Sequence, residues 1–257
     1  MKRTVGASVV QDGDELVASV VADGPAGGFP VDAARGQLAR IFSLDVDGSG
    51  FAAIGARDPV LGRLQERYEG LRPVCFWSAY EAAAWAVIGH RIRMSQAAGI
   101  KARLSAELGT RVDVGGQPVD AFPAPAVLRE LDSFAGLSGR KPEYLRALAT
   151  AALDGRLDSA RLRSLPREQA VAELCELPGI GPFSAELVLL RGAGDPDHFS
   201  LHEPRLGRAV GLAYGVEPTV QRLSEISAGW APYRTWASVL LRVWWEEAGP
   251  SAPTLRA

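Results

Sequence analysis

Apolar positions recur every three or four residues over most of this chain, the spacing that places them on one face of a helix. This pattern predicts helices at residues 31–42, 59–68, 77–90, 95–108, 126–131, 142–153, 167–176, 182–191, 204–214, 218–228 and 232–247. Several of these segments start at a proline, which is favoured in the first helical turn. Asp58 is the expected N-cap of the helix that follows it.

The first part of the chain has a more mixed pattern. Residues 15–22 (ELVASVVA) are rich in β-branched side chains and alternate in part between apolar and polar, which predicts a strand. Residues 110–124 contain several glycines and prolines and are expected to form an irregular connection. We therefore predict a mainly α fold, with a small α/β N-terminal domain at residues 1–72 and an α-helical body at residues 73–257.

Composition limits the classes of protein to consider. The 257 residues can bury a sizeable core, and 47% hydrophobic and 23% charged residues are ordinary for a soluble globular protein. No apolar run is long enough to span a bilayer, and the first ten residues, MKRTVGASVV, lack the apolar core of a secretion signal. We therefore expect a cytoplasmic location. The formal net charge of −2 disfavours extensive wrapping of nucleic acid, so any DNA-binding surface must be local.

The chain has only two cysteines, Cys75 and Cys175, and they are far apart in sequence. They cannot form a CxxC zinc site or supply the four thiolates of an iron–sulfur cluster. We expect both to be structural thiols, and we expect no cofactor.

The most informative segment is residues 177–185, LPGIGPFSA, which lies between two predicted helices. Gly179 and Gly181 bracket Ile180, so the backbone can turn sharply while Ile180 points inward. Main-chain amides of the 181–183 turn, at the start of the second helix, can then face a phosphate oxygen. Such a hairpin binds the DNA backbone without reading sequence. The alternative is a tight connection that serves packing or a protein partner.

Longer stretches around this motif carry a family resemblance. LPGIGPFSAELVLLRG, followed by DPDHFSLHEPRLGRAV, resembles the hairpin and following loop of the helix-hairpin-helix (HhH-GPD) superfamily of DNA glycosylases. Residues 86–92 (AVIGHRI) and 230–234 (WAPYR) resemble segments of its DNA-3-methyladenine glycosylase II (AlkA-like) branch, and residues 1–70 resemble a shortened form of that branch's N-terminal domain. The resemblance implies a monomer that excises alkylated purines from double-stranded DNA in base excision repair.

The resemblance also implies where catalysis occurs. In the superfamily an aspartate after the hairpin's second helix stabilises the cationic sugar that forms as the base leaves, and Glu203 falls at that position. Glutamate places the same charge about 1.5 Å further from the backbone. Glu203 can therefore act in place of the aspartate, or the protein binds damaged DNA without releasing a base, or Glu203 only caps the next helix. Asp195 and Asp197 lie in a GDPD sequence typical of a turn.

Bifunctional relatives form a Schiff base through a lysine at the position of Phe183. Because phenylalanine has no amine, we expect a monofunctional hydrolase with water as the nucleophile.

Other site residues follow from the same alignment. Arg91 is the expected wedge that fills the gap left by a flipped base, or a phosphate ligand, or an exposed helix-end arginine, and His90 lies beside it. The residues expected to bind DNA are Gly179, Ile180, Gly181, Pro182, Phe183, Ser184, Arg91 and His90. The candidate base pocket consists of Phe183, Tyr233, Trp236, Trp244 and His202, although each aromatic residue could instead belong to the core.

Two details of the alignment remain open. Arg242 stands at the position of the family's pocket tryptophan in an ungapped alignment, and Trp244 lies two residues later. Because of this mismatch, the sequence does not identify which damaged base is removed. Hairpins of this family also commonly bind a monovalent cation, here through the main-chain carbonyls of Cys175, Leu177 and Ile180. No catalytic metal is implied.

Overall fold

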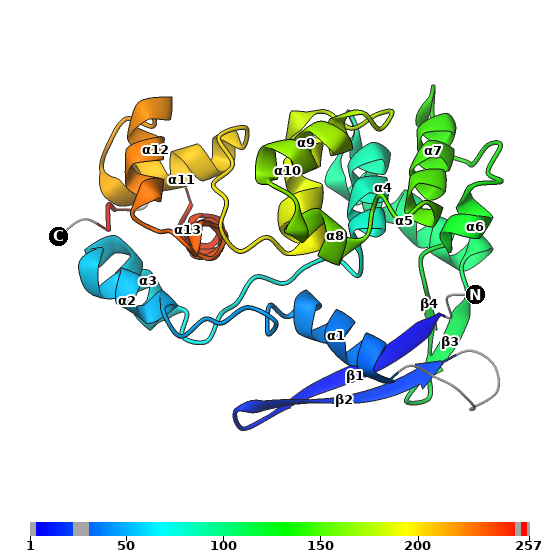
Figure 1. Ribbon diagram of the computed structural model, residues 1–257, viewed down its shortest axis with the longest axis horizontal. Coiled ribbons are helices and arrows are strands. Elements are labelled where there is room, and N and C mark those ends of the chain that lie inside the picture. Colours follow the sequence, from blue (N-terminus) through cyan, green and yellow to red (C-terminus); the bar gives the residue numbers. More distant parts are fainter. Residues whose placement is uncertain (1–3, 23–30, 250–252, 256–257) are drawn as a thin grey trace.

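The protein is described by a computed structural model that covers residues 4–22, 31–249 and 253–255, so the two basic residues at the start of the chain lie outside the described part. It is mainly α, as predicted (Figure 1). The helices are α1 (Val31–Ile41), α2 (Phe51–Arg57), α3 (Pro59–Arg67), α4 (Ala79–Gly89), α5 (Met94–Leu108), α6 (Pro125–Leu128), α7 (Lys141–Leu153), α8 (Ser159–Ser164), α9 (Arg167–Cys175), α10 (Pro182–Leu187), the π-helix η1 (Val188–Ala193), α11 (Pro204–Tyr214), α12 (Val220–Ala228) and α13 (Arg234–Ala248).

Four short strands form two antiparallel hairpins. β1 (Val5–Asp12) pairs with β2 (Glu15–Ala22), and β3 (Arg111–Val114) pairs with β4 (Gln117–Asp120). The expectation of an irregular connection at residues 110–124 was therefore wrong. Gly115 and Gly116 both have positive φ values, 63° and 82°, which is the backbone of a two-residue hairpin turn.

Two apolar cores organise the helices, and they form two groups in Figure 1. The first core is built by helices α4 to α10 with η1, around the alanine-rich α4, which is buried almost all round. Small side chains allow close packing there: a Cβ on Gly192 of η1 would lie 2.8 Å from the Cα of Ala79. This core is the platform that carries the 177–185 hairpin.

The second core joins helices from the two ends of the chain. Helices α2 and α3, which lie within the predicted N-terminal domain, pack with α11, α12 and α13. Asp58 ties this unit together: its Oδ1 accepts the amides of Val60 and Leu61, as expected of an N-cap, and its Oδ2 accepts the hydroxyl of Tyr214 at 2.6 Å and the indole of Trp230 at 3.1 Å. The predicted domain boundary at residue 72 stays a prediction. The buried cores group the helices differently, because α2 and α3 share a core with the C-terminal helices.

Two segments connect the cores: residues 68–78, between α3 and α4, and residues 194–203, between η1 and α11 (Figure 1). The second begins at Gly194, whose φ of 84° ends the helix, and it leads directly to Glu203. Helical periodicity predicted one α-helix over residues 182–191, but its second half is π-helical. Among the described residues, no helix combines the length and the apolar character that crossing a membrane requires.

Candidate active site

The 177–185 hairpin connects α9 to α10 much as its sequence predicted. Ile180 is only 5% exposed and belongs to the first core, and its amide donates to the carbonyl of Leu177 at 3.0 Å. Gly179 has a φ of 83°, and a Cβ there would lie 2.5 Å from the ring of Tyr144 on α7. Gly179 is therefore required both by backbone conformation and by space.

Gly181 has a different role from Gly179. Its backbone is extended, with φ −99° and ψ −179°, and a Cβ there would meet no described atom within 4 Å. The space beside Gly181 is thus open, and the amide of Phe183 is the first in helix α10, because Pro182 has none. The Phe183 ring is 50% exposed, while Ser184 is buried. The DNA-binding role of these residues stays a prediction.

The turn between α4 and α5 is held by the start of α7. Arg91 is exposed and has a φ of 55°, a left-handed conformation that few residues other than glycine adopt. The buried Lys141 at the start of α7 donates to the carbonyls of Ile88 and His90, both at 2.9 Å. Burial lowers the pKa of His90, and the charges of Lys141 and Arg91 lower it further.

Helix α7 links these two turns. Lys141 holds the turn that carries Arg91, and Tyr144, three residues later on the same helical face, packs under Gly179. The predicted wedge and the predicted phosphate-binding hairpin are therefore fixed to one helix.

Glu203 lies at the entry to α11, half-buried between the two groups of helices. Its Oε1 is 2.8 Å from Nη1 of Arg242 on α13, and Nη2 of Arg242 is 2.7 Å from Glu246. Glu203 occupies the N-cap position of α11, but within the described structure its carboxylate makes no hydrogen bond to the first turn of that helix. Burial raises the pKa of Glu203, and the guanidinium groups of Arg242 and Arg205 oppose that rise.

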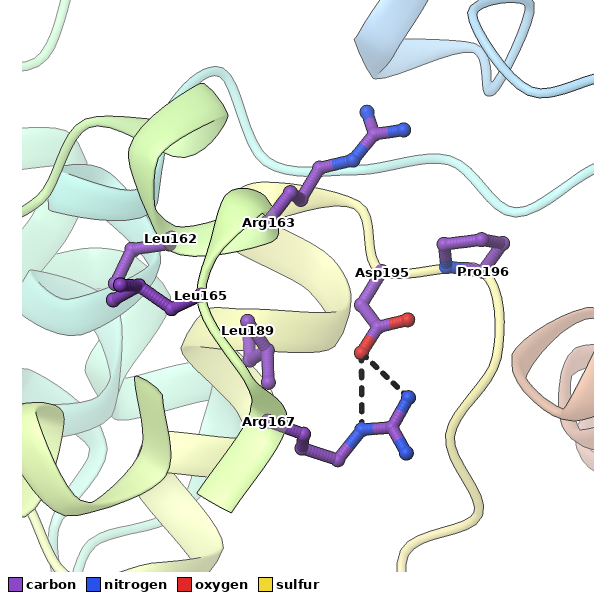
Figure 2. A pocket seen from close by; sticks show the side chains of 7 residues that line it. All are labelled: Leu162, Arg163, Leu165, Arg167, Leu189, Asp195 and Pro196. Atoms are coloured by element: carbon purple, nitrogen blue, oxygen red, sulfur yellow. Dashed lines mark hydrogen bonds and ion pairs between the residues drawn. The ribbon is translucent and has the colours of Figure 1, made fainter. Parts of the chain in front are cut away.

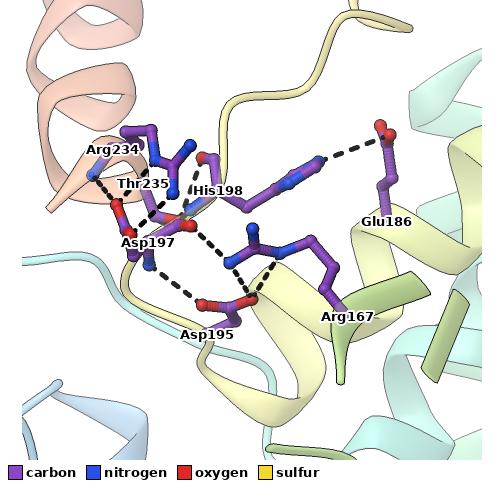
Figure 3. A network of polar contacts seen from close by, with 7 residues as sticks. All are labelled: Arg167, Glu186, Asp195, Asp197, His198, Arg234 and Thr235. Atoms are coloured by element: carbon purple, nitrogen blue, oxygen red, sulfur yellow. Dashed lines mark hydrogen bonds and ion pairs between the residues drawn. The ribbon is translucent and has the colours of Figure 1, made fainter. Parts of the chain in front are cut away.

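A second carboxylate was missed by the sequence analysis. Glu186 of α10 is buried and accepts a hydrogen bond from the hydroxyl of Ser200. Its Oε1 lies 2.9 Å from Nδ1 of His202 and 3.4 Å from Nε2 of His198 (Figure 3 shows His198). The available signal was a glutamate on the apolar face of the helix that follows the hairpin. His202, predicted for the base pocket, thus contacts the hairpin helix.

The acids of the GDPD sequence form the expected turn. Asp195 Oδ1 accepts the amide of Asp197 at 2.9 Å, and its Oδ2 pairs with Arg167 of α9 at 3.0 Å. Asp197 pairs with Arg234 at the start of α13 through two 2.8 Å hydrogen bonds (Figure 3). These pairs anchor residues 195–197 to both groups of helices.

A cavity of about 270 Å³ lies beside this turn (Figure 2). Leu162, Leu165 and Leu189 line its wall, and Asp195 and Arg167 meet at its edge, while Arg163 points away from them. Arg163 pairs with Asp45. Because each arginine already has a carboxylate partner and Glu203 is not in the lining, this cavity is separate from the candidate catalytic carboxylate.

The other aromatic residues proposed for the pocket are buried in the second core. Tyr233 donates from its hydroxyl to the carbonyl of Asp47 at 2.7 Å and packs against Trp236, and Trp244 is almost fully buried. This is the environment of core aromatics, the alternative that the sequence left open. Phe183 is the exposed member of the set, and a pocket role for the others stays a prediction.

No cluster of three or more potential metal-ligating side chains occurs in the described residues. The predicted cation would instead use carbonyls of the hairpin. The carbonyl of Leu177 accepts the amide of Ile180 and keeps one lone pair for such an ion, so the turn is compatible with it. The cation stays a prediction.

Comparison with known proteins gives a consistent set of relatives, although no protein-family model matches the chain. A DNA-3-methyladenine glycosylase of Bacillus subtilis is 25% identical over 78% of this chain and 68% of its own length. DNA-3-methyladenine glycosylase 2 of Escherichia coli is 32% identical over 73% of this chain, which spans 64% of that protein. The solved structure of a 3-methyladenine DNA-glycosylase from Archaeoglobus fulgidus has a TM-score of 0.77 at 22% identity, covering 93% of this chain and 82% of that one.

Proposed function

Because the chain belongs to the helix-hairpin-helix DNA glycosylases, in the branch of the DNA-3-methyladenine glycosylases, we propose that it removes modified purines from double-stranded DNA by hydrolysing the N-glycosidic bond. The observation that carries the proposal is the contact between Glu186 and His202 at 2.9 Å. It joins the helix of the DNA-binding hairpin to the residue directly before Glu203. A phosphate bound at the hairpin would thereby lie at a fixed distance from the carboxylate of Glu203.

The hairpin and the α4–α5 turn supply binding. Main-chain amides at the start of α10 would face a phosphate, and the open space at Gly181 leaves room for it. Arg91, held at its turn by Lys141, would enter the space that the flipped nucleotide leaves. Neither contact depends on the base sequence, and a repair enzyme needs this independence because damage can occur at any sequence.

Glu203 supplies the charge for catalysis. As the base departs, the deoxyribose gains oxocarbenium character, and an ionised carboxylate stabilises that positive charge. Arg242, 2.8 Å away, would hold the longer glutamate side chain in one orientation. Phe183 offers no amine, so water is the nucleophile and strand cleavage through a Schiff base is not part of the reaction. Alkylated purines are the substrates that the names of the relatives indicate.

The experiment measures the free bases released from a dimethyl-sulfate-treated duplex, which are quantified by mass spectrometry. Glu203→Gln should lower the single-turnover rate about 100-fold or more, whereas Glu246→Gln, which removes the other carboxylate beside Arg242, should keep the rate. Product strands should break only after alkali. An unchanged rate in Glu203→Gln would remove Glu203 from the reaction, and nicked strands before alkali would contradict the monofunctional mechanism.

A second candidate is a protein that binds damaged DNA without releasing a base. The ion pair between Glu203 and Arg242 favours it, because a guanidinium beside the carboxylate also repels a cationic sugar. This candidate predicts tight, salt-sensitive binding to abasic duplexes and no free base from wild-type protein.

A further inference from the structure

Most arginines of the described chain already have a partner. Arg222 of α12 pairs with Glu225 at 2.8 Å, and other arginines donate to main-chain carbonyls, as Arg57 does to Gly229. Within residues 4–22, 31–249 and 253–255, the arginines without a hydrogen bond, ion pair or ring contact are Arg35, Arg91, Arg93, Arg205 and Arg208, and all of them are exposed. These guanidinium groups can bind an anion without first breaking an internal contact.

Arg205 and Arg208 lie one turn apart on helix α11. Residues three apart on a helix are neighbours on its surface, with about 5–6 Å between their Cβ atoms. The buried face of α11, which includes Leu206 and Val210, packs in the second core, and the helix contains no acidic side chain. The exposed face of α11 therefore presents two neighbouring positive charges and no negative charge of its own.

The two arginines extend along the surface from the candidate catalytic carboxylate. Burial raises the pKa of Glu203, and the charges of Arg242 and Arg205 oppose that rise, so Arg205 lies within electrostatic reach of the carboxylate. Arg208 lines a surface hollow together with Trp245 of α13. Trp245 follows Arg242, the ion-pair partner of Glu203, by three residues. Both arginines are therefore on the side of α11 that lies along α13.

The position beside Glu203 indicates which anion these arginines meet. In the proposed reaction, the sugar of the flipped nucleotide lies at Glu203. The same nucleotide carries a phosphodiester on each side of its sugar, so negative phosphates come close to a carboxylate and repel it. The guanidinium groups of Arg205 and Arg208 offset that repulsion, and their planar donors match phosphate oxygens.

We propose that Arg205 and Arg208 bind the phosphodiesters of the damaged strand that adjoin the flipped nucleotide. The inference rests on the proposed glycosylase function and adds to it a second anion site. This site lies on the second core, whereas the hairpin at Gly181 is carried by the first core. The DNA backbone is then held by both groups of helices, and the segment that connects them carries Glu203 between the two contacts.

The first test measures binding to a duplex with a stable abasic analogue by fluorescence anisotropy over a series of salt concentrations. Each phosphate contact contributes about 0.9 to the slope of log K against log [salt]. The double variant Arg205→Gln/Arg208→Gln should therefore lower the size of that slope by about 2 and weaken binding about 10-fold or more at about 0.1 M NaCl. Arg205→Lys/Arg208→Lys should keep the slope, because lysine keeps both charges.

Two other arginines are matched controls. Arg222→Gln removes an exposed charge from the same group of helices, but one that Glu225 already pairs. Arg35→Gln removes an exposed and unpaired charge from α1, which lies across the connecting segments from α11 (Figure 1). Neither substitution should change the salt slope. Because Arg205 and Arg208 are exposed, their glutamine variant should unfold at the wild-type urea midpoint.

The second test identifies the phosphates that are bound. An uncharged methylphosphonate in place of a phosphate that adjoins the abasic analogue should weaken binding by wild type about threefold or more. The same replacement should weaken binding by the double glutamine variant less than about twofold, because that contact is already lost. Methylphosphonates several nucleotides away should affect the two proteins equally.

An unchanged salt slope in the double glutamine variant overturns the site. Equal effects of the adjoining methylphosphonates on the two proteins overturn the assignment to the phosphates of the flipped nucleotide. If wild type releases alkylated base while either result holds, this inference fails and the glycosylase function stands. A wild-type protein that neither releases base nor binds DNA in a salt-sensitive way overturns both.

Discussion

Oε1 of Glu203 lies 2.8 Å from Nη1 of Arg242, which joins the entry of α11 to the middle of α13. Burial raises the pKa of Glu203, and this arginine is the strongest opposing influence. The ion pair therefore limits how far burial raises the pKa of Glu203. The ion pair also explains how glutamate, which is longer than aspartate, can keep one orientation here, because Arg242 holds the carboxylate of Glu203.

Arg242→Gln should move the acid limb of base release to higher pH. A carboxylate with a raised pKa is ionised, and active, only above that pKa, so loss of the opposing guanidinium raises the pH at which activity disappears. Rate–pH profiles measure the shift. Glu246→Gln is the control with opposite sign, because Glu246 raises the pKa of Glu203. An unshifted acid limb in Arg242→Gln would show that the ion pair does not govern Glu203.

The two hairpin glycines should respond differently to alanine. Gly179→Ala should lower the free energy of unfolding by about 2 kcal/mol or more, because its φ is positive and its Cβ would collide with Tyr144. Gly181→Ala should change the free energy of unfolding by less than about 0.5 kcal/mol, because its Cβ enters open space at the turn. It should weaken DNA binding, because that space is the proposed site of the phosphate. Urea titration and fluorescence anisotropy measure the two effects. Equal destabilisation by both substitutions would contradict this division of roles.

Much of this hairpin could be predicted from sequence because its determinants are local. The inward position of Ile180, the N-cap at Asp58 and the helix starts at Pro182 and Pro204 each follow from residues within a turn of one another. The 111–120 hairpin was missed because its strands have only four residues each, and the two glycines of its turn were interpreted as loop.

The carboxylate partners could not be predicted in the same way. Glu186 meets His202 across 16 residues, and Glu203 meets Arg242 across 39, through packing of helices from different segments. No local sequence pattern predicts contacts between residues so far apart along the chain. The union of α2 and α3 with the C-terminal helices was missed for the same reason, since their common core forms only in three dimensions.

Lys141→Met should destabilise the protein by roughly 2 kcal/mol, because the buried carbonyl of Ile88 and the partly buried carbonyl of His90 lose their donor. Equilibrium unfolding in urea measures the change. Arg140→Met is the neighbouring control: Arg140 pairs with Glu143 at the surface, and its loss should cost less than about 1 kcal/mol. Comparable losses in the two variants would mean that Lys141 does not support the Arg91 turn as described.

Stability should fall in acid as Glu186 is protonated. Its pKa is about 2 in the folded protein against an ordinary 4.5, so its contribution is complete above about 4.5 and disappears as pH falls toward 2. The contribution is on the order of 3 kcal/mol, because each unit of pKa difference is worth about 1.4 kcal/mol. Glu186→Gln should remove that part of the pH dependence, measured by urea unfolding between pH 2 and 6. A variant with the full wild-type slope would place the acid sensitivity elsewhere.

The most direct test of the central claim is the single-turnover rate of base release from methylated duplex DNA by wild type and Glu203→Gln, with DNA affinity measured in parallel. Wild type should release free alkylated base, and Glu203→Gln should do so at a rate about 100-fold or more lower. Both should bind DNA with similar affinity, because Glu203 acts on the developing sugar cation. Release at the wild-type rate by Glu203→Gln, or tight binding with no release by wild type, would contradict it.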